Sequence, residues 1–151
     1  MSDAEKLHFK ITLGGTYWKK VPIYSISVND QLLFNKEITS PSGEYELIEF
    51  DADVKEGPCT LNIRLENKDD NDVVKDDPNS ADFKIVNDLL LNIKNIEIDE
   101  IDLGNLIFTK SQFVGDDKDR PVLNTCIDLG WNGTWTLPFE SPFYIWLLEN
   151  I

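Results

Sequence analysis

The chain has 151 residues, of which 41% are hydrophobic and 11% aromatic, and its formal net charge at pH 7 is −14. A chain of this length can bury a substantial core without a disulfide or a metal, and its apolar content excludes a disordered acidic segment. The charge disfavours nucleic acid and anionic membranes as ligands, because both recruit clustered lysines and arginines. We therefore expect residues 1–151 to form a single domain that binds neither of them.

The cysteines and the start of the chain bear on its location. Cys59 and Cys126 lack the close spacing of a zinc or redox motif and are expected to be core thiols. The opening segment MSDAEKLHFK has no apolar stretch of the kind that secretion signals contain, and no run approaches the roughly 18 apolar residues of a membrane span. We expect synthesis in the cytoplasm without such a signal.

Alternation of apolar and polar residues with a period of two predicts half-buried strands from the start of the chain. Residues 7–13 carry an apolar side chain at every second position, and the apolar segment 24–34 is interrupted by Asn29-Asp30. Asn and Asp tolerate the positive φ of a tight turn, so this segment is predicted to be a hairpin. Two further strands are expected between the hairpin and residue 66.

The same alternation continues through the second half of the chain. The expected strands cover 91–98, 101–108, 135–139 and 143–151. Asp99-Glu100 forms a second two-residue turn, and no segment of a dozen residues combines helical periodicity with caps. The sequence therefore predicts an all-β protein, a single antiparallel β-sandwich of jelly-roll-like form with eight or nine strands and less than about 10% helix.

The last segment, FYIWLLENI at 143–151, has apolar residues on both faces of an extended strand. A strand of this kind at an exposed edge would promote aggregation, so we expect it to lie centrally or beneath a partner. Phe143, Ile145 and Leu147 are expected to enter the core together, which makes this strand indispensable for folding.

An acidic segment, ENKDDNDVVKDD at 66–77, joins two predicted strands and holds six carboxylates and two lysines. Calcium takes six to eight oxygen ligands, which such a segment can supply. Asp70 and Asp72 begin like an EF-hand loop, but the glycine and the final glutamate of that motif are absent. A calcium site would therefore need several loops, and Asp88, just before LLLNI, could add a carboxylate. The alternative is a solvated loop whose charge maintains solubility.

The four tryptophans are the second indication of function. The apolar face of a sugar ring can stack on a flat aromatic side chain while amides and acids bond its hydroxyl groups. Trp18 in GGTYWKK and Trp131 in LGWNGTW lie beside loop glycines and are the candidates for a ligand platform. Trp135 and Trp146 are expected in the core or at an interface.

Catalysis has little support in the sequence. The single histidine, His8, occupies a strand position expected to face solvent, and motifs for a serine nucleophile, a Cys-His pair or a phosphate loop are absent. A glycosidase needs only two carboxyl groups across a cleft, but 28 acidic residues give no means of selecting a pair. We expect a protein that is not an enzyme.

Several segments together resemble a group of small proteins from tailed marine phages. They are NKDDNDVV at 67–74, Asp88 before LLLNI, the hairpin IEIDEIDLG and the C-terminal LGWNGTWTLPFESPFYIWLLENI. This group is similar to the calcium-dependent xylan-binding class of carbohydrate-binding modules, and the resemblance spans residues 7–151. The chain departs from the group at Glu100, where the relatives usually have glycine, and in the inserted segment DDPNSADFK.

The resemblance implies a noncatalytic β-sandwich in which loop carboxylates hold calcium and the calcium bonds directly to sugar hydroxyls. On this chain Asp69, Asp72 and Asp88 match the recurring acidic positions. The implied function is calcium-dependent adhesion to a glycan, or decoration of a phage particle, with many copies offsetting weak single-site affinity. The implied location is the virion, where a glycan, other virion proteins or further copies of the chain would be its partners.

Three alternatives stay open on the sequence alone. The first is a structural capsid or tail protein without a ligand, because fold does not fix function. The second is an acidic inhibitor that mimics nucleic acid at a basic site of another protein. The third is a small glycosidase.

Overall fold

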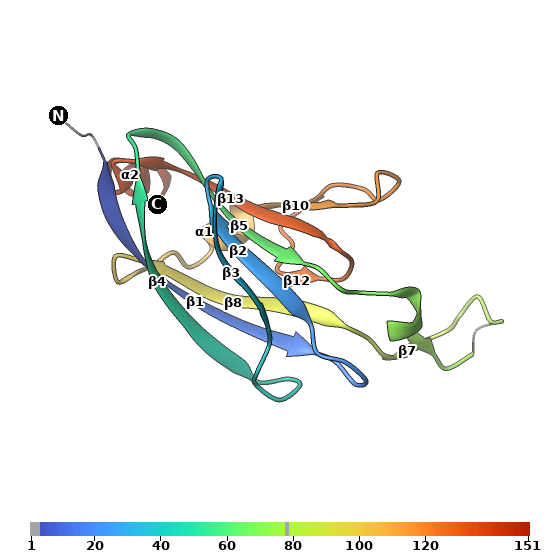
Figure 1. Ribbon diagram of the computed structural model, residues 1–151. Coiled ribbons are helices and arrows are strands. Elements are labelled where there is room, and N and C mark those ends of the chain that lie inside the picture. The colour runs from blue at the N-terminus through green and yellow to red at the C-terminus, as the bar shows by residue number, and fades with distance from the viewer. Residues whose placement is uncertain (1–3, 78) are drawn as a thin grey trace.

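The computed structural model describes residues 4–77 and 79–151, so Met1–Asp3 and Pro78 of the predicted domain lie outside the described residues. Figure 1 shows two sheets packed face to face, with strand order β12-β8-β1-β4 in one sheet, where β9 also pairs with β8, and β11-β10-β13-β5-β2-β3 in the other. The paired strands of both sheets are antiparallel. The all-β sandwich predicted from the alternation is confirmed.

The five-stranded sheet contains β1 (Glu5–Thr16), β4 (Tyr45–Val54), β8 (Leu90–Ile98), β9 (Ile101–Asp102) and β12 (Asp128–Leu129). The six-stranded sheet contains β2 (Ile23–Val28), β3 (Gln31–Glu37), β5 (Gly57–Leu65), β10 (Gln112–Gly115), β11 (Leu123–Asn124) and β13 (Gly133–Ser141). A short ribbon outside both sheets pairs β6 (Val74–Lys75) with β7 (Ile85–Asn87). The helical elements are η1 (Asp70–Asp72), α1 (Leu106–Thr109) and α2 (Phe143–Asn150).

The core lies between the two sheets and is built from the inward positions of the alternating strands. Leu7, Phe9 and Ile11 of β1 are fully buried, as is Trp135 of β13 on the facing sheet. The Phe9 ring lies edge-on to that of Phe139 across the core, with their centroids 6.3 Å apart. The period of two in the sequence thus places one face of each strand in the core.

Both predicted two-residue turns are present. Asn29 has φ 54°, and its side-chain Oδ1 accepts a hydrogen bond of 2.9 Å from the Thr60 backbone N–H. Asp99 and Glu100 have φ values of 51° and 66°, the left-handed pair that closes a tight hairpin. The glycine expected from the resemblance at position 100 is therefore replaced by a residue held at positive φ.

The prediction of a final strand is wrong, because residues 143–150 form the helix α2. Phe143, Trp146 and Leu147 are buried, whereas Ile145 is 56% exposed. That spacing is the helical i, i+3, i+4 pattern, which an apolar run shares with a strand when it is buried on more than one face. The Glu5 carboxylate accepts the Phe143 backbone N–H at 2.7 Å and so satisfies a free donor of the first turn.

A second segment assigned to a strand is also helical. Residues 106–109 form the short helix α1, in which Leu106 and Ile107 are buried and Phe108 is 41% exposed. Gly104, with φ 54°, turns the chain out of β9 just before it. The two helices comprise four and eight residues, within the helix content expected for an all-β protein.

Cysteines and tryptophans expected in the core are mostly found there. Cys59, Trp135 and Trp146 are buried, whereas Cys126 is only partly buried against the core, and both thiols are free. In the parts of the chain that the structure describes, no helix has the length and apolar character needed to cross a membrane.

His8 lies on the outer face of the five-stranded sheet, as expected. Its Nδ1 lies 2.6 Å from Asp51 Oδ1 and its Nε2 lies 3.1 Å from Glu49 Oε2. The hydrogen bond to Asp51 raises the pKa of His8 above its usual 6.5, partial desolvation opposes this, and the Glu49 hydrogen bond reinforces it. A raised pKa stabilises the fold fully below pH 6.5, and this contribution is lost as the pH rises through the folded-state pKa.

The helical assignment of the C-terminus makes a prediction for two adjacent leucines. Leu147→Ala should lower the free energy of unfolding by about 2–5 kcal/mol because a buried side chain is removed. Leu148→Ala is the matched control, since Leu148 is 72% exposed, and should change it by less than about 0.5 kcal/mol. Urea unfolding measures both changes. If Ile145→Ala lowered the free energy of unfolding as much as Leu147→Ala does, residues 143–150 would be a strand and not a helix.

His8 leads to a prediction about pH. Its ring resonances can be assigned without ambiguity, because it is the only histidine in the chain. An NMR titration of its ring should give a pKa above 6.5, and Asp51→Asn should bring that pKa down. The same substitution should reduce stability more at pH 5 than at pH 9. An unchanged titration curve in Asp51→Asn would show that this ion pair does not form in solution.

Candidate functional site

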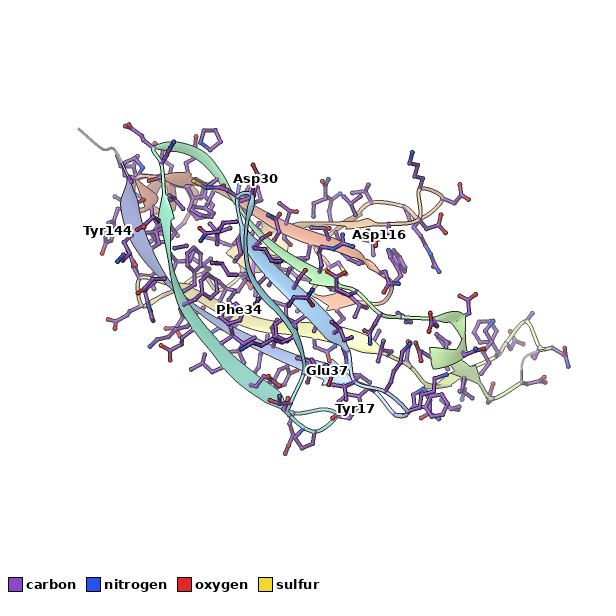
Figure 2. All side chains as sticks on the ribbon, viewed as in Figure 1. Tyr17, Asp30, Phe34, Glu37, Asp116 and Tyr144 are labelled. Carbon is purple, nitrogen blue, oxygen red and sulfur yellow. The ribbon has the colours of Figure 1, made fainter. Side chains whose placement is uncertain are left out.

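A cleft of about 770 Å³ lies at the end of the sandwich where the acidic connection meets two other loops. Its walls come from residues 68–75, 85–88, 116–120 and 130–132. Figure 2 labels Asp116 in this region and Tyr144 of α2 toward the opposite end of the molecule. The volume falls within the roughly 300–1,000 Å³ typical of small-molecule sites.

Trp131 forms an aromatic wall of this cleft. Its ring stacks on Phe113 of β10 at a centroid distance of 5.8 Å, and the Arg120 guanidinium carbon lies 4.5 Å from the indole centroid. The indole therefore contacts both a buried ring and an exposed cation. Its Nε1 is buried and has no hydrogen-bond partner among the described residues.

One glycine makes room for that indole, and a second one allows the two neighbouring strands to approach closely. A Cβ built on Gly115 would lie 2.6 Å from Trp131 Nε1, and one on Gly133 would lie 2.5 Å from the Val114 carbonyl oxygen. Gly115 and Gly133 pair directly between β10 and β13. The close approach of these strands, which larger residues would prevent, brings Trp131 to the mouth of the cleft.

Lys68 and Asn132 hold the walls of the cleft together. The Lys68 backbone N–H donates to Asn132 Oδ1 at 2.7 Å, and Asn132 Nδ2 donates to the Lys68 carbonyl at 2.9 Å. The Lys68 ammonium donates to Asp88 Oδ1 at 2.6 Å and to the Gly130 carbonyl at 2.5 Å. This lysine side chain is only 10% exposed, so the ion pair is largely desolvated.

Charge on the cleft walls is mixed. Five aspartates and three basic residues line it, which leaves an excess of negative charge. Asp116 is held by Arg64 through two hydrogen bonds of 3.1 and 2.9 Å. A bidentate pair of this kind fixes the carboxylate in place and lowers the repulsion from its acidic neighbours.

Asp72 anchors the acidic connection beside the cleft. It is 1% exposed, its Oδ2 accepts from the Asp69 backbone N–H at 2.7 Å, and the Lys20 ammonium lies 2.9 Å from the same oxygen. Burial alone would raise the pKa of Asp72, but the Asp69 N–H and the Lys20 and Lys19 ammonium groups hold it below its usual 3.8. The segment is thus tied to the 19–20 turn rather than freely solvated.

The three carboxylates predicted to bind calcium each face a lysine instead of one another. Lys20 contacts both Asp69 and Asp72, and Lys68 contacts Asp88. Within residues 4–77 and 79–151, no group of three or more acidic, histidine or cysteine side chains is arranged to hold a metal ion. In this arrangement the residues do not fit calcium, which would have to displace the ammonium groups, and calcium binding stays a prediction.

The two candidate tryptophans do not share this cleft. Trp131 lines it, whereas Trp18 is not among the lining residues. The Trp18 indole N–H donates to the Asp72 carbonyl at 2.9 Å, and the ring is 45% exposed beside Lys19. Trp18 therefore supports the acidic connection, and a ligand role for either ring stays a prediction.

Asn132, Lys68 and Arg120 are among the cleft residues that the sequence did not single out. Asn132 follows Trp131 directly and could have been included with it, since amides commonly bond sugar hydroxyls. Lys68 lies inside the acidic segment, where it was counted only as a charge. Arg120 lies in a loop without any motif, and only the tertiary structure brings it over the indole.

Comparison with known proteins supports the fold. No model of a known protein family matches the chain, and no curated protein matches it. A solved structure described as "vCBM60 in complex with galactobiose" matches with a TM-score of 0.52 and covers 86% of this chain and 96% of its own, at 8% sequence identity. At that identity the match shows a shared fold, so the chain has the β-sandwich fold of a carbohydrate-binding module.

The anchoring of Asp72 leads to a stability prediction. Asp72→Asn should lower the free energy of unfolding at pH 7 by about 1.5–3 kcal/mol, because it removes the charge that Lys20 and Lys19 face. Asp70→Asn, in the same turn but exposed, is the control and should be near neutral. Because the pKa of Asp72 is depressed, the wild-type advantage should be present above pH 3.8 and vanish as the pH falls through the folded-state pKa. Equal effects of both substitutions on urea unfolding would contradict the anchoring role.

Proposed function

We propose that the protein is a noncatalytic glycan-binding module and that the cleft beside Trp131 is its ligand site. The observation that carries this proposal is the convergence of an indole, a side-chain amide and a desolvated carboxylate–ammonium pair on one cleft. The shared fold with a carbohydrate-binding module supports it. Sugars present both an apolar ring face and hydroxyl groups, and this set of side chains complements both.

A ligand can reach the aromatic wall where Arg120 now lies. Phe113 stacks on Trp131, and the Arg120 guanidinium carbon lies 4.5 Å from the indole centroid. Arg120 is exposed, so a sugar ring can take its place over the indole at the cost of a cation–π contact worth about 0.5–1 kcal/mol at such sites. Affinity at one site would then be modest, and display of many copies would raise it.

Binding rather than hydrolysis accounts for the arrangement of the acids. Asp88 and Asp116 of the cleft are each engaged by a basic side chain. A glycosidase would need one carboxyl group positioned to protonate a leaving group and a second one across the scissile bond. The charge pairs instead give fixed donors and acceptors, which suit recognition of hydroxyl groups.

One finer proposal rests on the sequence resemblance: attachment to a phage particle, as an adhesion or decoration protein. The resemblance also predicts dependence on calcium, which the lysine pairs of Asp69, Asp72 and Asp88 do not favour. Mass spectrometry of purified particles tests the attachment, and an abundant protein without any glycan ligand would favour the structural alternative. Salt-sensitive binding to a basic host protein, in place of a glycan, would favour the nucleic-acid mimic.

A glycan array with purified protein tests the ligand site. Wild type should bind a defined set of glycans, and Trp131→Ala should weaken that binding at least tenfold because the ring face is lost, about 1.4 kcal/mol. Tyr144→Ala is the matched control, since Tyr144 is an exposed aromatic residue of α2 outside the cleft, and it should bind as wild type does.

Two outcomes would overturn the assignment. Loss of binding in Trp18→Ala with retention in Trp131→Ala would move the site to the 17–20 turn. Release of reducing sugar from a bound glycan would show that the protein is an enzyme.

A further inference from the structure

We propose that the Lys68 ammonium acts as a fixed cation of the cleft and, together with Asp88, binds hydroxyl groups of a neutral glycan without calcium. This inference rests on the proposed function, because it names the ligand class and the recognising groups of the same cleft. It concerns a residue pair that is defined by the tertiary structure and not by a motif.

Among the described residues, the Lys68 ammonium has acceptors for two of its three N–H donors. A lysine ammonium has three N–H donors, and two of them are taken by Asp88 Oδ1 and the Gly130 carbonyl. No third acceptor is found for it among the described residues, although the side chain is nine-tenths buried at the wall of the cleft. The third N–H is therefore free to donate to a ligand acceptor in the cleft.

Asp88 supplies the complementary acceptor. Its Oδ1 is occupied by the Lys68 ammonium and by the Leu89 backbone N–H at 2.7 Å. Its Oδ2 has no hydrogen-bond partner in the described parts of the chain, and the side chain is 19% exposed toward the cleft it lines. The pair therefore offers one free donor and one free acceptor side by side.

This combination matches the chemistry of sugar hydroxyl groups. Each hydroxyl can donate one hydrogen bond and accept others, so one can accept from Lys68 while it or its neighbour donates to Asp88. Both bonds involve a charged partner and are stronger than bonds between neutral groups. Asn132 fixes the Lys68 backbone on both sides, which reduces the entropy lost when the ligand binds.

The charge of the walls selects the class of glycan. With five aspartates against three basic residues, the cleft repels uronic acids and sulfated sugars. A neutral glycan meets no such repulsion. Lys68 already holds the charge of Asp88, so the cleft needs no further cation for a hydroxyl group to bind.

The experiment compares Lys68→Met, which keeps the stem and removes the ammonium, with Lys36→Met, which removes one exposed charge on β3 away from the cleft. The probe is the neutral glycan that wild type binds best on the array, titrated by calorimetry in calcium and in chelator at equal ionic strength. We expect one wild-type Kd in both buffers, at least tenfold weaker binding by Lys68→Met, and wild-type affinity for Lys36→Met. Should Lys68→Met not fold, Asp88→Asn keeps an acceptor for Leu89 and should show the same loss.

Each contrary result points to a different failure. Wild-type binding that disappears in chelator, or Lys68→Met and Asp88→Asn binding that equals wild type, would overturn this inference and leave the proposed function intact. Binding of sulfated or uronic-acid glycans in preference to neutral ones would overturn the ligand class. A wild type that binds no glycan would overturn the proposed function. In that case the melting temperature of wild type, compared in calcium and in chelator, tests the role of the ammonium. A higher melting temperature in calcium would show that Lys68 does not replace the metal.

Discussion

Two hydrogen bonds between the Asn132 side chain and the Lys68 backbone hold together the end of the sandwich on which the cleft is built. They join the segment that follows β5 to the loop that leads into β13, and the Lys68 side chain then reaches Asp88 just before β8 in the other sheet. One residue thus couples both sheets. Without it, the Asp88 carboxylate would lose the ammonium group that balances its charge.

The negative charge of the protein is organised by this tertiary arrangement. Lys20 contacts Asp69 and Asp72 from a turn about fifty positions earlier in the chain, and Arg64 holds Asp116. Several acidic side chains are therefore paired with basic residues from distant parts of the chain. A cleft walled by such pairs presents fixed donors and acceptors, which suit the uncharged ligand proposed for it.

At the opposite end of the sandwich, the helix α2 closes the core. There α2 packs Phe143 and Trp146 against the core, and Glu5 bonds to the first turn of the helix. The core is closed at this end by a helix instead of another strand. The helix that closes the core and the proposed ligand site therefore lie at separate ends of the sandwich.

The sequence by itself determined the sandwich, because a period of two and left-handed turn residues such as Asn29 and Asp99 act through local geometry. It also singled out Trp131, Asp69 and Asp88, which line one cleft, but it could not find Lys68, Asn132 or Arg120 beside them. Residues 143–150 are apolar at most positions, so the choice between strand and helix depended on which neighbours they cover. The partners of Asp72 and Asp88 were equally out of reach, because ion pairs between distant segments leave no period in the sequence. Whether a carboxylate faces a lysine or a neighbouring carboxylate was decided only when the two sheets brought their loops together.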